Sequence, residues 1–207
     1  IFRRSKRDIY SKKYCFEVAL RTFIYMITFR LLEETDLIDR VSWINTPSIF
    51  NNMSFDQKVT NERTKAWYER VKSIPFRYDF VLEEDGSLLA MGGITSYISS
   101  SKTAETYTFT NPILHSKGYG TLMLYLGCRF TLTSPNFECL IAYIRPTNTS
   151  SLKIHERIGF TEIRESRHGS LPMAKEGHLC FELTSSSFNK ELLSQSMLNS
   201  INTSLIL

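Results

Sequence analysis

A glycine-rich turn at residues 110–121 is the feature that most constrains this chain. It reads Thr-Asn-Pro-Ile-Leu-His-Ser-Lys-Gly-Tyr-Gly-Thr, after a β-prone run at 103–110 and before an apolar helical run at 121–132. A strand that stops at such a turn and continues as a helix points unpaired backbone N–H groups at one spot, where the helix dipole adds positive charge. Gly118 and Gly120 remove the side chains that would hold an anion away. The turn therefore predicts a phosphate site.

Two common phosphate motifs do not fit this turn. A Walker loop needs Gly-Lys followed by Ser or Thr, whereas Lys117 precedes its glycine. A Rossmann fingerprint needs three glycines, and two are present here. The turn therefore belongs to neither of these two motifs.

Length and charge narrow the class of protein. The 207 residues predict one domain with extensions, and a hydrophobic share of 42% is enough for a core. The net charge of +4 is too mild to indicate a nucleic-acid partner, although it is compatible with an anionic small molecule. No nucleic acid is expected.

Residues 1–25 are expected to form a basic extension before the domain. A solvated arm is the favoured interpretation, and a membrane-surface role is a weaker alternative. The apolar stretch that follows is too charged for a membrane span, and no secretory cleavage site follows it, so no membrane partner is expected. The basic residues are Arg3, Arg4, Lys6, Arg7, Lys12 and Lys13.

The four cysteines predict neither a metal site nor a disulfide framework. Cys15, Cys128, Cys139 and Cys180 form no C-x-x-C pair, and His178 is the one histidine near Cys180. Free thiols in a reducing cytoplasm are the expected state.

The order of predicted elements indicates an α+β fold. Strands are predicted at 27–31, 77–83, 87–98, 103–110, 139–144, 160–164 and 178–183. Helices are predicted after an N-cap at Thr35 and at 61–73, 121–132 and 149–158. This order is too mixed for a doubly wound sheet, so we expect a single domain at 26–184 with a mostly antiparallel central sheet flanked by helices.

The C-terminal tail at 185–207 is expected to be an amphipathic helix. Leu193, Met197, Ile201 and Leu205 recur every four residues. Such a stripe favours packing against the chain's own domain over recruitment of a partner.

Three segments together carry a family resemblance. They are His115-Ser-Lys-Gly118-Tyr-Gly120, the proline at Pro112, and the segment from Asn148 through Ser151 and His155 to Gly159-Phe160. With these motifs in this order, the chain resembles the GNAT superfamily of acetyl-CoA-dependent N-acetyltransferases. It departs from the pattern at His115, where the family has Arg or Gln, and at His155, where Tyr is usual. The N-terminal half is similar to the branch that modifies ribosomal-protein N-termini or sugar-nucleotide amines.

The resemblance implies where acetyl-CoA would bind. Strands 103–110 and 139–144 would splay apart, and pantetheine would lie between them as an extra strand would. The backbone at 109–111 would meet the pantetheine amides, the turn at 115–121 would hold the pyrophosphate, and the start of the helix after 148 would hold the pantetheine arm. Asn148 is alternatively a plain N-cap. The implied residues are Phe109, Thr110, Asn111, His115, Ser116, Lys117, Gly118, Tyr119, Gly120, Thr121, Asn148 and Ser151.

Two side chains are candidates for the chemistry. Glu105 lies seven residues before Pro112, where relatives carry a carboxylate, and it would take a proton from the amine; its alternative is an ordinary solvent-facing Glu. His155 would protonate the leaving sulfur as an imidazolium, or it would only hydrogen-bond the coenzyme or pack locally. Backbone N–H groups near Phe109 or Thr110 would stabilise the oxyanion.

The resulting expectation is an enzyme that transfers acetyl from acetyl-CoA, without a metal, to a primary amine of a small molecule or a protein N-terminus by direct attack on the thioester. The alternative is a non-catalytic acyl-CoA-binding or regulatory module, which the departure at His155 motivates. A monomer or a homodimer is expected. The loops at 44–60 and 164–177 would select the acceptor.

Overall fold

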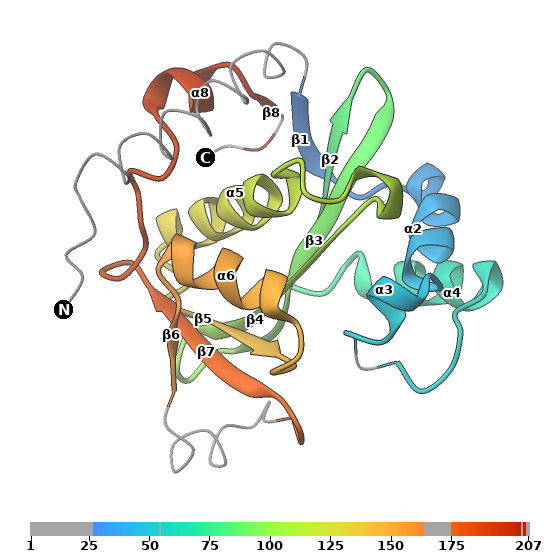
Figure 1. Cartoon of the computed structure of the whole chain (residues 1–207), viewed down its shortest axis with the longest axis horizontal. Coiled ribbons are helices and arrows are strands. Elements are labelled where there is room, and N and C mark those ends of the chain that lie inside the picture. Colours follow the sequence, from blue (N-terminus) through green and yellow to red (C-terminus); the bar gives the residue numbers. More distant parts are fainter. Residues whose placement is uncertain (1–26, 54, 164–174, 204, 206–207) are drawn as a thin grey trace, which may run out of the picture.

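The computed structural model of the chain describes residues 27–53, 55–163, 175–203 and 205. Within them lies an eight-stranded sheet with the order β6-β7-β5-β4-β3-β2-β1-β8, shown in Figure 1. Neighbouring strands are antiparallel except at β4–β5 and β1–β8, so the predicted α+β fold with a mostly antiparallel sheet is confirmed. The strands are β1 Ile27–Leu31, β2 Tyr78–Glu84, β3 Ser87–Ile98, β4 Thr103–Thr110, β5 Cys139–Ile144, β6 Thr161–Glu162, β7 Leu179–Thr184 and β8 Asn202–Thr203.

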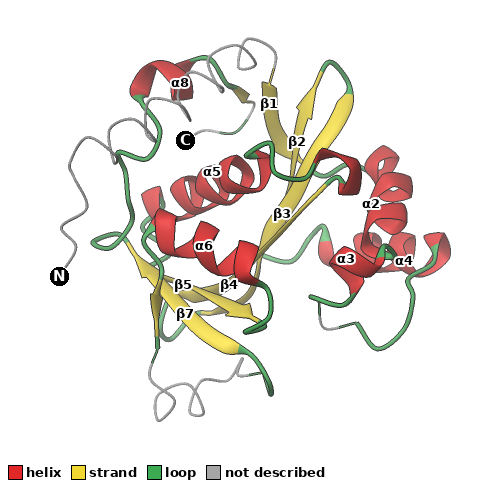
Figure 2. Cartoon of the chain, in the orientation of Figure 1, coloured by secondary structure: helices red, strands yellow, loops and turns green. Residues whose placement is uncertain are grey.

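Helices cover both faces of this sheet (Figure 2). Side chains alternate between faces along a strand, and the two large buried clusters divide accordingly. Phe80 and Ala90 pack with α5, whereas Val81 and Met91 pack with α2 and α3. The helical elements are η2 Glu34–Asp36, α2 Leu37–Ile44, α3 Pro47–Phe50, α4 Asn61–Val71, η3 Pro112–Leu114, α5 Tyr119–Thr133, α6 Thr149–Ile158 and α8 Gln195–Asn199.

A short 3-10 helix, η2, connects β1 to α2 and so determines where the helical region α2–α4 begins. The predicted N-cap at Thr35 is wrong: η2 starts at Glu34, and Glu33 caps it through a capping box with Asp36. Asp36 is buried and accepts two hydrogen bonds from Arg30, from Nη1 at 2.8 Å and from Nη2 at 2.9 Å. The paired guanidinium and carboxylate connect the start of this helical region to strand β1.

The C-terminal tail packs on its own domain, as expected, but it is not one helix. Leu193, Met197 and Ile201 are buried in the main cluster, while the helix is confined to α8. The chain then extends into β8, which pairs in parallel with β1. The unpaired edge of β1 offers backbone hydrogen bonds that Asn and Thr, which are poor helix formers, gain more easily as a strand.

Two further predictions need correction or lie outside the described residues. The strand predicted at 160–164 is limited to β6, Thr161–Glu162. The basic extension at 1–25, with Cys15, lies outside the part of the chain that the structure describes.

The pairing of β4 with β5 decides where a ligand can enter. The two strands pair at Thr103↔Cys139, Ala104↔Leu140 and Glu105↔Ile141, and their pairing ends there. Beyond Glu105 the strands diverge, which confirms the predicted splay. We call this divergence of β4 and β5 the fork. It exposes the β4 edge from 106 to 110 between the two strands.

Candidate active site

A cavity of about 360 Å³ opens at the fork between β4 and β5. Its walls come from β4 residues 105–110, from β5 residues 142–144, from α6 residues 150, 151, 154 and 155, and from α3 with the residues just after it. His115, Gly120, Lys175 and His178 complete the lining. The cavity therefore joins the segments that carry the sequence motifs.

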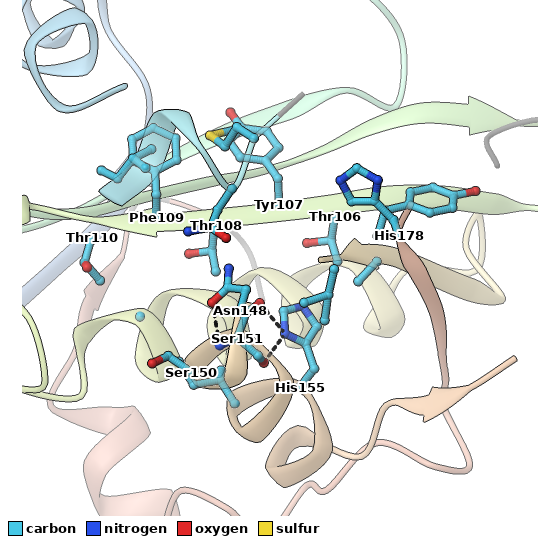
Figure 3. Close-up of a pocket in the computed structure, with 18 of the residues that line it drawn as sticks. Thr106, Tyr107, Thr108, Phe109, Thr110, Asn148, Ser150, Ser151, His155 and His178 are labelled. Atoms are coloured by element: carbon cyan, nitrogen blue, oxygen red, sulfur yellow. Dashed lines mark hydrogen bonds between the residues drawn. The ribbon is translucent and has the colours of Figure 1, made fainter. Parts of the chain in front are cut away.

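The cavity has two sides because β4 side chains alternate across the sheet. In Figure 3, Thr106, Thr108 and Thr110 point toward α6, whereas Tyr107 and Phe109 point away from it. Phe109 packs with α2, so Tyr107 and Phe109 face the α2 group. By the same alternation Glu105 lies on the α2 side, while His155 belongs to α6 on the other side. The fork is the passage between the two faces.

The β4 backbone groups that face the fork are not the ones that the sequence predicted. Asn111 N–H donates to the Leu89 carbonyl at 3.0 Å, and the side-chain amide of Asn111 donates to the Leu88 carbonyl. In an antiparallel pair every second residue faces the partner, so Phe109, two residues earlier, also turns its backbone toward β3. The expected role of the Asn111 and Phe109 backbone toward pantetheine is therefore wrong. The groups facing the fork belong to Thr106, Thr108 and Thr110.

The glycine-rich turn has the predicted backbone geometry. Ser116 and Gly118 have φ of 65° and 90°, and Gly118 is the N-cap of α5. The first helical hydrogen bond runs from Leu122 N–H to the Gly118 carbonyl at 3.0 Å, so the N–H groups of Tyr119, Gly120 and Thr121 have no intrahelical partner. These amides sit where an anion would gain from the helix dipole.

Side chains around the turn leave room for a ligand. His115, Ser116 and Lys117 are exposed, whereas Tyr119 and Thr121 are buried and can offer only their backbone. A Cβ on Gly120 would lie 3.1 Å from Thr110 Cγ2, so the missing side chain keeps this wall of the cavity open. The residues thus fit a bound diphosphate, although the part played by each stays a prediction.

Asn148 caps α6 at the cavity. Its side-chain oxygen accepts a hydrogen bond from Ser151 N–H at 3.1 Å, so the N-cap interpretation is confirmed. The amide group of Asn148 still lines the cavity with its NH₂ donors, beside Ser150 and Ser151. A role toward the pantetheine arm remains compatible with the cap.

His155 is neutral at pH 7 in this fold. The imidazole is buried, and burial lowers its pKa to about 4. Its Nδ1 lies 2.8 Å from the Ser151 carbonyl oxygen, which only accepts, so Nδ1 carries the hydrogen and Nε2 is an acceptor. The ring also packs edge-on against Phe160, with centroids 4.8 Å apart. The imidazolium that an acid role requires forms only well below neutral pH.

This burial predicts a pH-dependent stability. His155 takes up a proton at about pH 6.5 when unfolded but only at about pH 4 when folded, so the unfolded state binds more protons between these values. Neutral, buried His155 therefore makes its full contribution to the free energy of unfolding above pH 6.5, and this contribution is lost as the pH falls toward 4. Between pH 7 and pH 5, the free energy of unfolding should fall by about 2 kcal/mol less in His155→Gln than in the original protein. Urea unfolding of both proteins at the two pH values measures this, and equal losses would show that His155 does not titrate in this range.

Glu105 stands at the last paired position of the fork. Its side chain is 15% exposed, lines the cavity and forms an ion pair with Lys175. Ser96 Oγ donates to its second oxygen at 3.5 Å. An arriving ammonium group would find a carboxylate already arranged to hold a cation.

Several lining residues were not singled out from the sequence. Lys175 pairs with Glu105 and lies 5.0 Å from the Tyr143 ring centroid. His178 also lines the cavity, and its Nδ1 donates to the Glu176 carbonyl at 2.9 Å. No local pattern marks the contacts of Lys175, because they join segments far apart in sequence. Ser48, Ile49, Asn52 and Met53 do lie within the loop expected at 44–60, whereas 164–174 is outside the described residues.

A protein-family model, the acetyltransferase (GNAT) domain, matches residues 26–161, which is more than half of the chain. The chain belongs to the GNAT acetyltransferase family. It is an acetyl-CoA-dependent N-acetyltransferase, as the motifs around the fork predicted. No curated protein was found to match this GNAT acetyltransferase in sequence.

Solved structures share the fold of this GNAT acetyltransferase. Spermidine N-acetyltransferase from Vibrio cholerae, in complex with CoA and spermine, has a TM-score of 0.66 at 16% identity, covering 78% of this chain and 97% of that one. An uncharacterized protein from Bacillus halodurans has a TM-score of 0.66 at 12% identity, covering 84% and 92%. A domain from Methanocaldococcus jannaschii has a TM-score of 0.62 at 18% identity, covering 76% and 97%. At these identities the likeness concerns the fold.

The described residues contain neither a candidate membrane span nor a candidate metal cluster. None of the described helices has both the length and the apolar character needed to cross a membrane. Within the same residues, no three His, Cys, Asp or Glu side chains gather closely enough to hold a metal ion.

Proposed function

We propose that this GNAT acetyltransferase acetylates a primary amine of a small molecule that enters from the α2 side of the fork. The single observation that carries the proposal is the end of β4–β5 pairing at Glu105, which opens one cavity to both faces of the sheet. Acetyl-CoA supplies the acetyl group as a thioester. The amine and the thioester then reach the fork from opposite faces.

Each part of the site has a role in this proposal. Amides at the start of α5 hold the diphosphate, and the backbone edge of Thr106, Thr108 and Thr110 orients the pantetheine arm as a neighbouring strand would. A backbone N–H of that edge stabilises the oxyanion, a contribution of about 3 kcal/mol per donor in other enzymes.

Glu105 is the proposed general base. The ammonium of the acceptor replaces Lys175 at the carboxylate, which takes one proton directly or through water. The neutral nitrogen then forms a bond to the carbonyl carbon as the carbon–sulfur bond breaks, and the nitrogen releases its second proton to water to give the neutral amide. The sulfur leaves as a thiolate, because a thiol of pKa about 8.5 needs no acid to depart at neutral pH.

His155 has a binding role in this proposal and not an acid role. Its Nδ1–H is used by the Ser151 carbonyl, and its pKa of about 4 leaves no proton to give at neutral pH. The imidazole keeps Ser151 and the start of α6 in place against the cavity. This is the alternative that the sequence left open for His155.

Polyamines and peptide N-termini are the competing acceptors. Structures of similar fold include an enzyme with bound spermine, and the N-terminal half resembles the branch that modifies ribosomal-protein N-termini or sugar-nucleotide amines. A polyamine needs several carboxylates, but Glu105 is the one carboxylate among the described residues that line the cavity, and Lys175 already pairs with it. This favours an acceptor with one amine over a polycation.

An acceptor panel tests the proposal. Thiol release from acetyl-CoA should be measured with amino sugars, amino acids, spermidine and a peptide with a free N-terminus. We expect the highest kcat/KM with a monoamine, at least about 10-fold above spermidine, because one unpaired charge costs roughly that factor. A preference for spermidine or for the peptide would reject the proposed acceptor. No thiol release with any amine, despite acetyl-CoA binding, would favour the non-catalytic alternative.

Two wider expectations remain part of this proposal. A monomer or homodimer is expected, while a structure of similar fold is a dodecamer, so light scattering of the purified chain decides between them. A reducing cytoplasm fits the thiols of Cys128, Cys139 and Cys180, which form no disulfide among the described residues.

A further inference from the structure

A second cavity, of about 440 Å³, lies between α2 and α4 on the same side of the sheet as Glu105. Three arginines line it: Arg40 from α2, and Arg63 and Arg70 from α4. One carboxylate, Asp56, is among its described lining residues, so three positive charges face one negative charge. This volume suits a small molecule.

Arg40 is the side chain in this cavity whose buried donors a ligand could satisfy. It is 6% exposed, and its Nη1 is buried without a hydrogen-bond partner among the described residues. Its guanidinium carbon lies 4.4 Å from the Trp67 ring centroid, 5.4 Å from that of Phe109 and 5.6 Å from that of Tyr107. Aromatic faces stabilise a cation in part, but they accept none of its hydrogen bonds.

Asp79, the carboxylate that contacts Tyr107, is already used by other groups. Asp79 accepts hydrogen bonds from Arg77 Nε at 2.9 Å and from the Tyr107 hydroxyl. A buried Lys or His could escape its cost by losing a proton, but a guanidinium stays charged in proteins. Arg40 therefore keeps a buried positive charge with unused donors beside a cavity.

Arg63 and Arg70 extend this charge along one face of α4. They flank Trp67 at spacings of four and three residues, which places all three on the same side of the helix. Both arginines are exposed, while Thr64 in the same wall is buried. Guanidinium groups match the paired oxygens of phosphate in geometry as well as charge.

We propose that this second cavity binds the phosphate group of a small phosphorylated molecule. The three guanidinium groups outnumber the Asp56 carboxylate, and a phosphate dianion would neutralise the net positive charge that remains. Tyr107 and Phe109 line the first cavity and also contact Arg40, so the two cavities share a wall. The phosphate belongs either to the acceptor itself or to a separate effector. Binding at this site does not depend on the proposed acetyl transfer.

Calorimetric titration of the full chain with inorganic phosphate, at constant ionic strength, tests the site. Arg63→Gln/Arg70→Gln should raise the phosphate Kd at least about 10-fold, because hydrogen bonds between charged groups are worth that factor or more. Lys65→Gln/Lys72→Gln is the matched control: it removes two positive charges from α4 and its C-cap, at residues that do not line the cavity. Its Kd should stay within about 2-fold of the original, since exposed charges act weakly.

Arg40→Gln is the third variant, and its circular dichroism spectrum is compared with that of the original protein to check that it folds. It should lose phosphate binding as the double arginine variant does. Absence of saturable phosphate binding, or equal weakening in the arginine and lysine variants, would overturn the proposal. The acetyl-transfer assay then separates the two sources: phosphate that competes with the acceptor marks an acceptor phosphate, and phosphate that does not compete marks an effector.

Discussion

Glu105→Gln is expected to lower kcat by about 10²–10⁴ while acetyl-CoA binding changes little. A general base contributes roughly this factor, and the amide cannot take a proton from the ammonium group. In the proposed binding mode the diphosphate and pantetheine contacts come from α5, α6 and the β4 edge, and none of them needs the Glu105 carboxylate. The two measurements are kcat by thiol release and the Kd of acetyl-CoA by calorimetry.

Glu138→Gln is the control for this variant. Glu138 is an exposed carboxylate that pairs with Lys102 at 3.2 Å, away from the fork, and its loss should leave kcat unchanged. An undiminished kcat in Glu105→Gln would remove Glu105 as the base. His178 would then be the next candidate, because its Nδ1–H is held by the Glu176 carbonyl and its Nε2 is left to accept a proton.

Gly120→Val is expected to raise the Kd of acetyl-CoA by about 100-fold or more. A Cβ at this position would lie 3.1 Å from Thr110 Cγ2 and 3.7 Å from Ile154 Cδ1. The two further carbons of valine must then crowd this wall or enter the cavity, where they fill the space of the ligand. Misplacing a bound group by about 1 Å costs this order of magnitude.

Gly127→Ala separates the local effect from a general effect on the helix. Gly127 is in the same helix, α5, and a Cβ there would make an ordinary contact 3.7 Å from the Phe80 ring. Its acetyl-CoA Kd should be unchanged, and both variants should be compared by thermal unfolding. Unaltered binding in a folded Gly120→Val protein would mean that the diphosphate does not lie at the start of α5.

Much of the fold was predictable because its signals are local. β1, β3, β4, β5 and α6 have the predicted boundaries. Gly159 ends α6 with φ of 110°, a conformation that favours glycine, and Asn148 begins it with a side-chain cap. Where the signal was weak, as in the tail after Asn199, a free sheet edge overrode the helical pattern.

The site was predictable only in part, for a reason of register. The sequence located the turn, the fork strands and Glu105. It placed the backbone groups that meet pantetheine on Phe109, Thr110 and Asn111, whereas the groups that face the fork belong to Thr106, Thr108 and Thr110. Successive residues of a strand turn their backbone groups to opposite sides, and the pairing with β3 decides which of them face the fork.

By itself, the sequence determined the family, the glycine turn and the order of the elements, because these depend on residues within a few positions of each other. The tertiary structure decided which groups meet across long separations. It paired Glu105 with Lys175, buried His155 so that it is neutral, and placed Arg40 beside an arginine-lined cavity. Such contacts depend on how strands and helices pack, and burial then sets the charge state and the need for a ligand.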